Sequence, residues 1–315
     1  MVALVQILIL SVIRSHSLEI RYTHEMINNI QNQQYLLGAE AWGVGQVQDI
    51  MPLGVNQAVY TLPPTAYDNR IVEAHLIDLQ SKININALSS FNRMALINAF
   101  KTQLPDLSDE QIFGIIDKIK SEVLAHKSNL SSKNLKTVLN YLSRTINSVP
   151  EPKPGLYPNL SLEENPYFVS ITELLSFDEI NSNLFQIMMP TLTALPQTTA
   201  VNINTAPGPV LLALSQTWTP EIIQKIIAQR KQNGPYHSVD DFLNQSFFTE
   251  SGVKKEDFTA INITVLSQYF LCESRLTMGD HILTLYSLIQ AAPEKNALDP
   301  NKMTVRVLWR SFGSL

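Results

Sequence analysis

The sequence has a single cysteine, no excess of positive charge and none of the common catalytic motifs. Cys272 by itself provides neither an internal disulfide nor a cysteine-rich metal site. The formal net charge is −5 and the pI is near 5.7, which gives no general attraction for nucleic acid or anionic lipid. The patterns GxxxxGK[ST], HExxH, GxSxG and GxGxxG are all absent. We therefore expect a non-enzymatic protein without catalytic residues.

The acids and histidines leave one question about metals open. The six histidines have no ligand-like spacing, and we interpret them as surface or turn residues. Carboxylates gather locally, as at Glu163 and Glu164. They are either acids favoured by the dipole at helix N-termini, as Asp109 and Asp240 suggest, or oxygen ligands of a calcium site.

The chain begins with an apolar run that continues into a helix-compatible stretch. Residues 1–13 (MVALVQILILSVI) would span about 20 Å as a helix, less than the ~30 Å hydrocarbon core of a bilayer. The run lacks the basic region and small-residue cleavage site of a secretory signal peptide. It is either the start of a buried helix or a membrane anchor. We favour the anchor because residues 17–50 contain no proline and carry apolar residues every fourth position: Leu18, Tyr22, Met26 and Ile30. This plan resembles a type IV pilin or pseudopilin.

Strand-like patterns flank a long helical stretch. Residues 70–79 alternate, with Val72, Ala74 and Leu76 on one face, whereas residues 51–69 read as a loop that contains Pro63 and Pro64. Near the C-terminus, alternating segments at 261–265, 281–290 and 303–309 predict an antiparallel meander. The sequence therefore places strands at both ends of the folded region.

The intervening stretch has clear signals for helix starts and stops. Ser108 with Gln111, and Ser170 with Glu173, are capping-box pairs. Thr219-Pro220 predicts a helix start and Gly234 its end. A stripe at residues 135–146 predicts a further helix, and the proline-rich segment 149–158 predicts a rigid connector.

The expected fold class is α+β: a pilin-like long N-terminal helix on a small antiparallel sheet, with a large all-α domain inserted. We place the anchor and pilin helix at residues 1–50, the sheet domain at 51–86 and 255–315, and the inserted domain at 87–254. An insertion is the simplest arrangement because the first strand and the meander are far apart in sequence. The insertion contains a faint repeat: Asn84-Ile85-Asn86-Ala87 and Asn202-Ile203-Asn204-Thr205 each open a small helix-hairpin unit.

Residues 201–243 resemble two families. One is the helix-hairpin-helix DNA-binding module of competence-type receptors, and the other is the helical domain of minor pseudopilin K. A DNA-binding hairpin needs a glycine-rich turn with lysines nearby. Here the turn at 216–220 has no glycine, and the nearest base, Lys225, lies inside the next helix. We favour a scaffold role for the hairpin and keep a membrane-tethered DNA-binding protein as the alternative.

Four further segments, in the family's order, resemble the type II secretion minor pseudopilin K family. They are the apolar start, Leu37–Trp42 (LGAEAW), Ile77–Asn86 (IDLQSKININ), and Asn165–Leu174 (NPYFVSITEL). The resemblance implies a subunit at the tip of the secretion pseudopilus, with a structural role in its assembly and in protein secretion. It also implies the minor pseudopilins I and J as partners, prepilin processing with N-methylation, and a single-pass inner-membrane anchor with the C-terminal domain in the periplasm.

The resemblance also suggests what to expect of individual residues. Family members bind calcium, but their acidic segments do not match here, so Glu163, Glu164 and Asp178 are only loose candidates and no cofactor is required. Most pilins carry a glutamate at the fifth mature position, which offsets the N-terminal amine of a neighbouring subunit. If Met1 stands at or next to the mature start, this chain has Val5 there, beside the uncharged Gln6. Because an unpaired buried amine is unfavourable, we expect no subunit above this one in the fibre.

Overall fold

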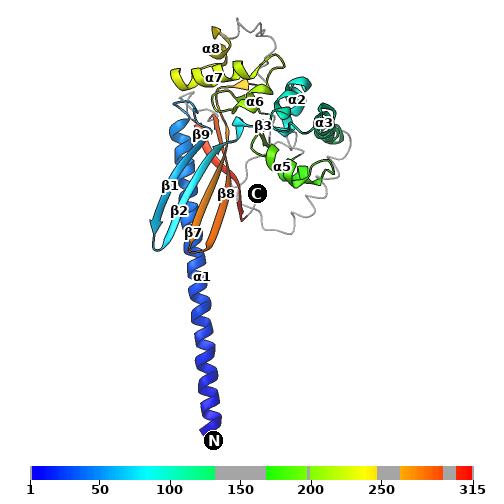
Figure 1. Cartoon of the computed structure of the whole chain (residues 1–315). Coiled ribbons are helices and arrows are strands. Elements are labelled where there is room, and N and C mark those ends of the chain that lie inside the picture. The colour runs from blue at the N-terminus through cyan, green and yellow to red at the C-terminus, as the bar shows by residue number, and fades with distance from the viewer. Residues whose placement is uncertain (1, 132–167, 197–198, 247–262, 294–302, 314–315) are drawn as a thin grey trace.

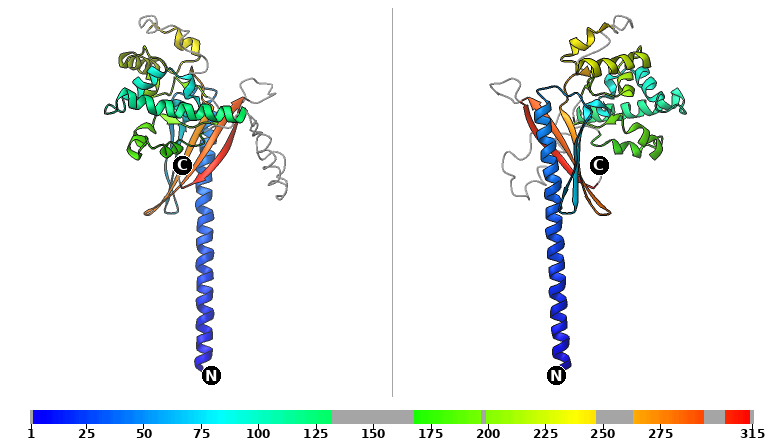
Figure 2. Two further views of the ribbon diagram at one scale, coloured as in Figure 1. Left: turned by 90° about the vertical axis from the view of Figure 1, so that its right-hand side faces the viewer. Right: turned by 60° about the vertical axis from the view of Figure 1, so that its left-hand side comes forward.

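A single helix, α1 (Val2–Ile50), runs for 49 residues from the N-terminus into the body of the protein (Figure 1). The computed structural model describes residues 2–131, 168–196, 199–246, 263–293 and 303–313, with side chains from residue 14 onward and not at 125–131. The helix is uninterrupted because the first proline comes at Pro52, just beyond its end. Its first half projects away from the rest of the molecule, and its second half lies along a sheet (Figure 2).

The sheet has five antiparallel strands in the order β1-β2-β7-β8-β9. The strands are β1 (Val59–Tyr67), β2 (Arg70–Asp78), β7 (Tyr269–Met278), β8 (His281–Pro293) and β9 (Met303–Phe312). Asp68 and Asn69, both at positive φ, close the β1–β2 hairpin, and Gly279 at φ +55 lies in the turn from β7 to β8. The predicted α+β class, with a long helix on an antiparallel sheet, is confirmed.

Three details of the strand prediction were wrong. Residues 59–67, predicted as part of a loop, form a strand at the edge of the sheet. Pro63 and Pro64 are tolerated there because they lie at a bulge in a strand that has one unpaired side. β7 was missed because it is covered on both faces and therefore shows no simple alternation. The segment predicted at 261–265 contributes only β6 (Ile263–Thr264), which pairs outside the main sheet.

The second half of α1 packs on one face of the sheet. Leu36, Ala39 and Val47 of the helix are buried against a face formed by Val72, Leu76, Phe270, Cys272, Leu285 and Ile289. The period-two face predicted for β2 is thus the face that contacts α1.

The chain between β2 and β7 forms a mainly helical body at the end of the sheet farthest from the N-terminus (Figures 1 and 2). It has its own core, which includes Ile85, Leu96, Ile116, Val210 and Phe242. Two pairs of parallel two-residue strands add a little sheet: β3 (Ile83–Asn84) with β4 (Leu192–Thr193), and β5 (Val201–Asn202) with β6. The helices are α2 (Arg93–Lys101), α3 (Asp109–Ser131), α5 (Ser182–Met188), α6 (Gly208–Leu212), α7 (Pro220–Asn233) and α8 (Val239–Leu243).

The predicted helix ends are confirmed in this body. Ser108 and Gln111 exchange hydrogen bonds in both directions before α3, and Ser170 and Glu173 form a capping box on the 3-10 helix Ile171–Ser176. Pro220 opens α7, and Gly234 follows it at φ +86. The stripe predicted at 135–146 and the connector at 149–158 lie outside the described residues.

Candidate functional site

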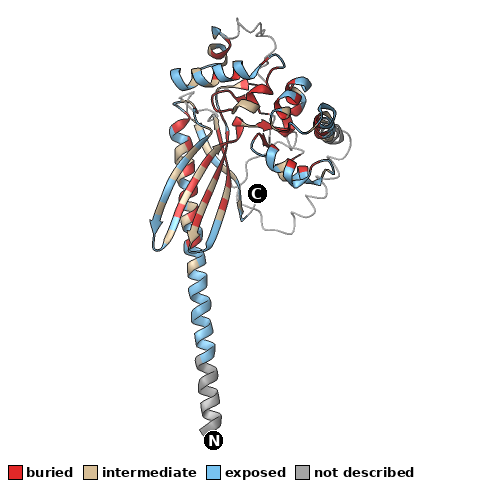
Figure 3. Ribbon diagram, in the orientation of Figure 1, coloured by how far each residue is buried: buried red, intermediate tan, exposed pale blue. Residues whose placement is uncertain are grey.

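The projecting part of α1 is an exposed surface rich in apolar side chains. Between residues 14 and 30 almost every side chain faces solvent (Figure 3). Six large apolar residues there are 48–73% exposed: Leu18, Ile20, Tyr22, Met26, Ile27 and Ile30. An exposed apolar area of this extent on one element indicates an interaction surface.

Val5 and Gln6 lie on α1 near its free end. No helix among the residues that the structure describes combines the length and apolar character needed to cross a membrane.

Polar and steric contacts fix the other half of α1 to the sheet. Glu40 is buried and accepts two hydrogen bonds of 2.7 Å from the Arg310 guanidinium, and the Ser287 hydroxyl donates a third. A Cβ at Gly43 would lie 2.6 Å from Sγ of Cys272, so helix and sheet approach closely there. The projecting half of α1 is therefore held in one direction relative to the sheet.

Asp78 connects the sheet to the helical body. It ends β2, is fully buried, and continues the period-two series of inward-facing residues on that strand. Its Oδ2 accepts hydrogen bonds from the hydroxyls of Thr205 at 2.5 Å and Ser267 at 2.7 Å, and its Oδ1 accepts one from the backbone N–H of Gln80 at 2.9 Å. Asn202 Nδ2 lies 3.5 Å from Oδ2. One carboxylate thus joins β2 to both the β5 region and the segment that leads into β7.

In the described part of the chain, the groups that stabilise the charge of Asp78 are neutral hydrogen-bond donors. Within the described ranges it forms no ion pair with a lysine or arginine. Burial raises the pKa of Asp78 to about 6, and the donors from Thr205, Ser267 and Gln80 oppose this rise. Asp78 belongs to the family-like segment at 77–86, but its partners are 127 and 189 residues away in sequence. One sequence signal could have identified Asp78: it is an acid at a position of β2 where the alternation predicts an inward-facing residue.

The repeat seen in the sequence is present in three dimensions. Asn86 binds the backbone of Phe168 in both directions, with Oδ1 accepting from N–H at 3.0 Å and Nδ2 donating to C=O at 2.8 Å. Asn204 binds Tyr236 in the same way, at 2.8 and 3.0 Å. In each unit the first asparagine, Asn84 or Asn202, accepts a hydrogen bond from the backbone N–H of the second. The two N-x-N segments are therefore equivalent structural elements.

The turn between α6 and α7 uses its own polar groups. The backbone N–H of Thr217 bonds to Ser215 Oγ, and that of Trp218 to the Ser215 carbonyl. Trp218 is buried and packs edge-on against Phe242, with ring centroids 6.2 Å apart. A turn whose N–H groups bond internally has fewer donors to offer a phosphate, so the geometry supports the scaffold interpretation.

The candidate calcium ligands are not brought together in the described structure. Asp178 is exposed between the 3-10 helix and α5, and Glu163 and Glu164 lie outside the described residues. Within the described part of the chain, no group of three or more histidine, cysteine or acidic side chains is placed to hold a metal. Calcium binding stays a prediction.

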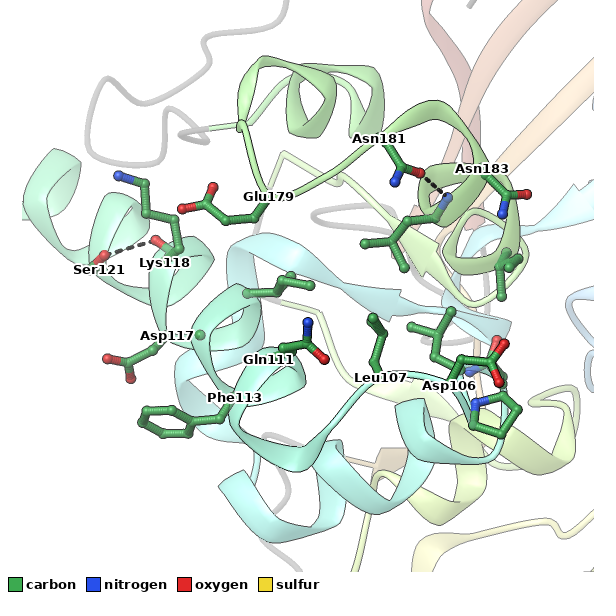
Figure 4. Close-up of a pocket in the computed structure, with 17 residues that line it drawn as sticks. Asp106, Leu107, Gln111, Phe113, Asp117, Lys118, Ser121, Glu179, Asn181 and Asn183 are labelled. Atoms are coloured by element: carbon green, nitrogen blue, oxygen red, sulfur yellow. Dashed lines mark hydrogen bonds between the residues drawn. The ribbon is translucent and has the colours of Figure 1, made fainter.

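A cavity of about 820 Å³ lies between α3 and α5 (Figure 4). Lys118 and Glu179 lie at one end, and Asp106 and Asn183 at the other. The hydroxyl of Ser121 donates to the Lys118 carbonyl at 2.8 Å, and the described lining includes no histidine or cysteine. The Ser121 hydroxyl, a potential nucleophile, thus bonds to a backbone carbonyl in the described structure.

Comparisons with known proteins agree with one another. Residues 201–261 match the family model "Type II secretion system (T2SS), protein K". The chain is 27% identical over 173 residues to the Type II secretion system protein K of Pseudomonas aeruginosa, a match that covers 52% of this chain and 46% of that protein. It thus spans about half the length of this curated relative.

The structure is also similar to a chain in the crystal structure of the GspK–GspI–GspJ complex from the enterotoxigenic Escherichia coli type 2 secretion system. The TM-score is 0.59 at 19% identity, over 93% of this chain and 99% of that one. The similarity in fold therefore extends over almost the whole chain. The family model and the curated relative confirm the resemblance to the type II secretion protein K family that the sequence motifs indicated, and the solved structure shows a shared fold.

Proposed function

We propose that the chain is a minor pseudopilin of a type II secretion system, with a structural role in assembly of the pseudopilus and in protein secretion. The observation that carries this proposal is the geometry of α1. One half is fixed to the sheet through Glu40 and Arg310, and the other half projects with apolar residues exposed. Such a helix is suited to packing against the helices of neighbouring subunits, which would remove its apolar side chains from water.

The partners we propose are the minor pseudopilins I and J, and the location is the inner membrane, with a single N-terminal anchor and the remainder in the periplasm. We also propose that residues 87–254 form a domain inserted into a pilin-like domain at 51–86 and 255–315. This protein would contribute assembly geometry and no bond chemistry.

We place the subunit at the tip of the pseudopilus. The helical body lies at the end of the sheet opposite the N-terminus (Figure 1), where it would obstruct a subunit stacked above. If the mature chain starts at or next to Met1, Val5 occupies the position of the usual glutamate and supports the same placement, because it would not offset the amine of a subunit above.

Co-purification tests the partner proposal. Full-length chain, extracted in detergent, should retain pseudopilins I and J, and Met26→Glu or Ile30→Glu should reduce their recovery severalfold. Asn29→Glu is the matched control, since it adds the same charge at an exposed polar position of the same helix. Equal recovery with all three variants would show that the projecting half of α1 does not form the contact.

Val5→Glu tests the tip position, and mass spectrometry of the membrane-extracted protein should first define the mature N-terminus. We expect no gain in incorporation from this substitution. Longer fibres with the variant subunit along their whole length would show that the subunit does not occupy the tip.

Calcium binding at the acids of the helical body, with Glu163, Glu164 and Asp178 as candidates, is a separate proposal. Calorimetric titration of the protein with calcium at millimolar concentration should give saturable heat. A flat titration would remove the proposal and leave the structural role untouched.

A further inference from the structure

A second, smaller cavity lies where the helical body meets the segment that joins α1 to β1. Its volume is about 420 Å³, within the range of small-ligand sites. Its walls come from the α1–β1 connection, the second N-x-N segment, and the end of α7 with the glycine that follows. The lining residues are Asn56, Gln57, Ala58, Asn204, Thr205, Arg230, Lys231, Gly234 and Pro235.

The cavity is positively charged in a protein whose net charge is −5. Arg230 and Lys231 both line it, and its described lining contains no aspartate or glutamate. Lys231 is exposed, whereas Arg230 is half-buried, and burial lowers the pKa of its guanidinium. A cation that loses water without gaining a counter-charge is unfavourable, so this site favours an anion.

The described hydrogen bonds of the Arg230 guanidinium use only part of its N–H donors. One Nη1 N–H bonds to the Ile203 carbonyl at 2.8 Å, which holds the side chain against the β5 region. A guanidinium has five N–H donors, and the described residues provide no carboxylate within ion-pair distance of it. The hydrogen bond to Ile203 therefore fixes the position of the guanidinium and leaves N–H donors that a ligand could bind.

The deeper polar groups of the wall are already occupied. Asn204 uses its amide on the backbone of Tyr236, and the Thr205 hydroxyl donates to Asp78 on the far side of the wall. The side-chain donors that face a ligand are the Arg230 guanidinium, the Lys231 ammonium and the carboxamide NH2 groups of Asn56 and Gln57.

We propose that this cavity binds a carboxylate. The planar fork of Arg230 matches the two oxygens of a carboxylate, and Lys231 adds charge at the mouth. The mainly polar lining and small volume suit one acidic side chain or a small dicarboxylic acid. The proposal does not depend on the protein being a pseudopilin. The carboxylate comes either from a free acid or from an acidic residue of another chain, and different probes distinguish these sources.

Calorimetric titration of the full-length chain in detergent tests the site, with succinate, inorganic phosphate and the peptide acetyl-Glu-Glu-amide as probes. We expect saturable 1:1 binding of a carboxylate that weakens as salt is added. Arg230→Lys, which keeps the charge but loses the fork, should weaken binding about tenfold. Lys231→Gln, at an exposed position that should not affect folding, should weaken it about threefold. Lys225→Gln removes a charge from the same helix outside the cavity and is the control.

The probes and variants give separable outcomes. Binding of the peptide but not succinate would support a carboxylate on another chain, and equal binding of both would support a free acid. Tight binding of phosphate without binding of either carboxylate would overturn the assignment. Equal weakening by Lys225→Gln and Lys231→Gln would also overturn it, because it would show attraction to the helix as a whole. An absence of saturable binding by the wild-type chain would mean that there is no site.

Discussion

The two N-x-N units of the helical body share one design, yet they join the sheet differently. The first follows β2 directly along the chain, whereas the second bonds to the buried Asp78 at the end of β2 through the Thr205 hydroxyl. In each unit the second asparagine clamps the backbone of an aromatic residue, and a serine two positions later caps the next helix. In each unit the first asparagine lies on a short strand in a parallel pair. The same local chemistry therefore builds both units from segments far apart in sequence.

The difference between the units is concentrated at one aligned position. The residue after the second asparagine is Ala87 in the first unit and Thr205 in the second. Ala87 is buried in the apolar core, whereas the Thr205 hydroxyl reaches Asp78 of β2. The comparison teaches that the repeated clamp provides local structure, and that one added hydroxyl gives the second unit a hydrogen bond to the buried acid at the end of β2.

Loss of the asparagine clamp should have the largest effect, and a similar one in both units. Asn204→Ala would remove both hydrogen bonds to the buried backbone of Tyr236, and Asn86→Ala would remove the corresponding two at Phe168. We expect each change to lower the free energy of unfolding of the helical body by about 4 kcal/mol.

Urea unfolding followed by Trp218 fluorescence, with the other two tryptophans replaced by phenylalanine, measures this loss. Asn29→Ala on the exposed face of α1 is the control and should leave the transition unchanged. A large effect at Asn204 with almost none at Asn86 would show that the two clamps are alike in geometry but not in energy.

The connection through Asp78 should show itself as a pH dependence. Burial raises the pKa of Asp78 from 3.8 to about 6, so the folded state holds its proton more tightly than the unfolded state does. The stability from this group is complete below about pH 4 and is lost as the pH rises through 6. Relative to Asp78→Asn, the wild type should therefore lose about 2 kcal/mol between pH 4 and pH 7.

Urea unfolding of both proteins at several pH values gives this difference, and the other acids cancel in the subtraction. Asp117→Asn, at an exposed acid of α3, serves as the control and should track the wild type. A difference between wild type and Asp78→Asn that is constant with pH would contradict the raised pKa.

Local features of the fold could be predicted from the sequence, and connections between distant segments could not. The caps at Ser108 and Ser170, the inward face of β2 and the N-x-N repeat each depend on residues close together in the chain. β7 was missed because its residues Tyr269 and Phe270 are buried against opposite layers, one near the helical body and one near α1. The partners of Asp78 come from distant segments that only the folded structure brings together.

Removal of the Thr205 hydroxyl should make the second unit resemble the first. Thr205→Ala deletes one hydrogen bond to a buried carboxylate and should lower the free energy of unfolding by about 2 kcal/mol at pH 7. Thr205→Ser keeps the hydroxyl and should restore most of this loss. A double-mutant cycle with Asp78→Asn measures the coupling. A coupling near zero would mean that the 2.5 Å contact contributes nothing to the connection.

The helix caps should give the smallest effect and a finer comparison of the units. Ser170 and Ser238 each accept a hydrogen bond from a backbone N–H in the first turn of the helix that follows, and an acid three residues later, Glu173 or Asp241, bonds back to the backbone. Replacement of either serine by alanine should lower stability by about 1 kcal/mol. In the first unit Glu173 accepts from the backbone N–H groups of both Val169 and Ser170, at 2.8 and 2.9 Å. In the second, the backbone hydrogen bond that the described structure gives the Asp241 carboxylate comes from the N–H of His237, at 3.2 Å. The first helix start therefore keeps more of its capping after the serine is lost, so Ser170→Ala should be the milder change.

Urea unfolding of the two variants beside Ser121→Ala, which removes a hydroxyl bonded within α3, measures which of the two serine substitutions lowers stability more. If Ser170→Ala proved the more damaging of the two, the reciprocal acid would not compensate for the lost cap, and the two units would differ in their local chemistry as well as in their connection to the sheet.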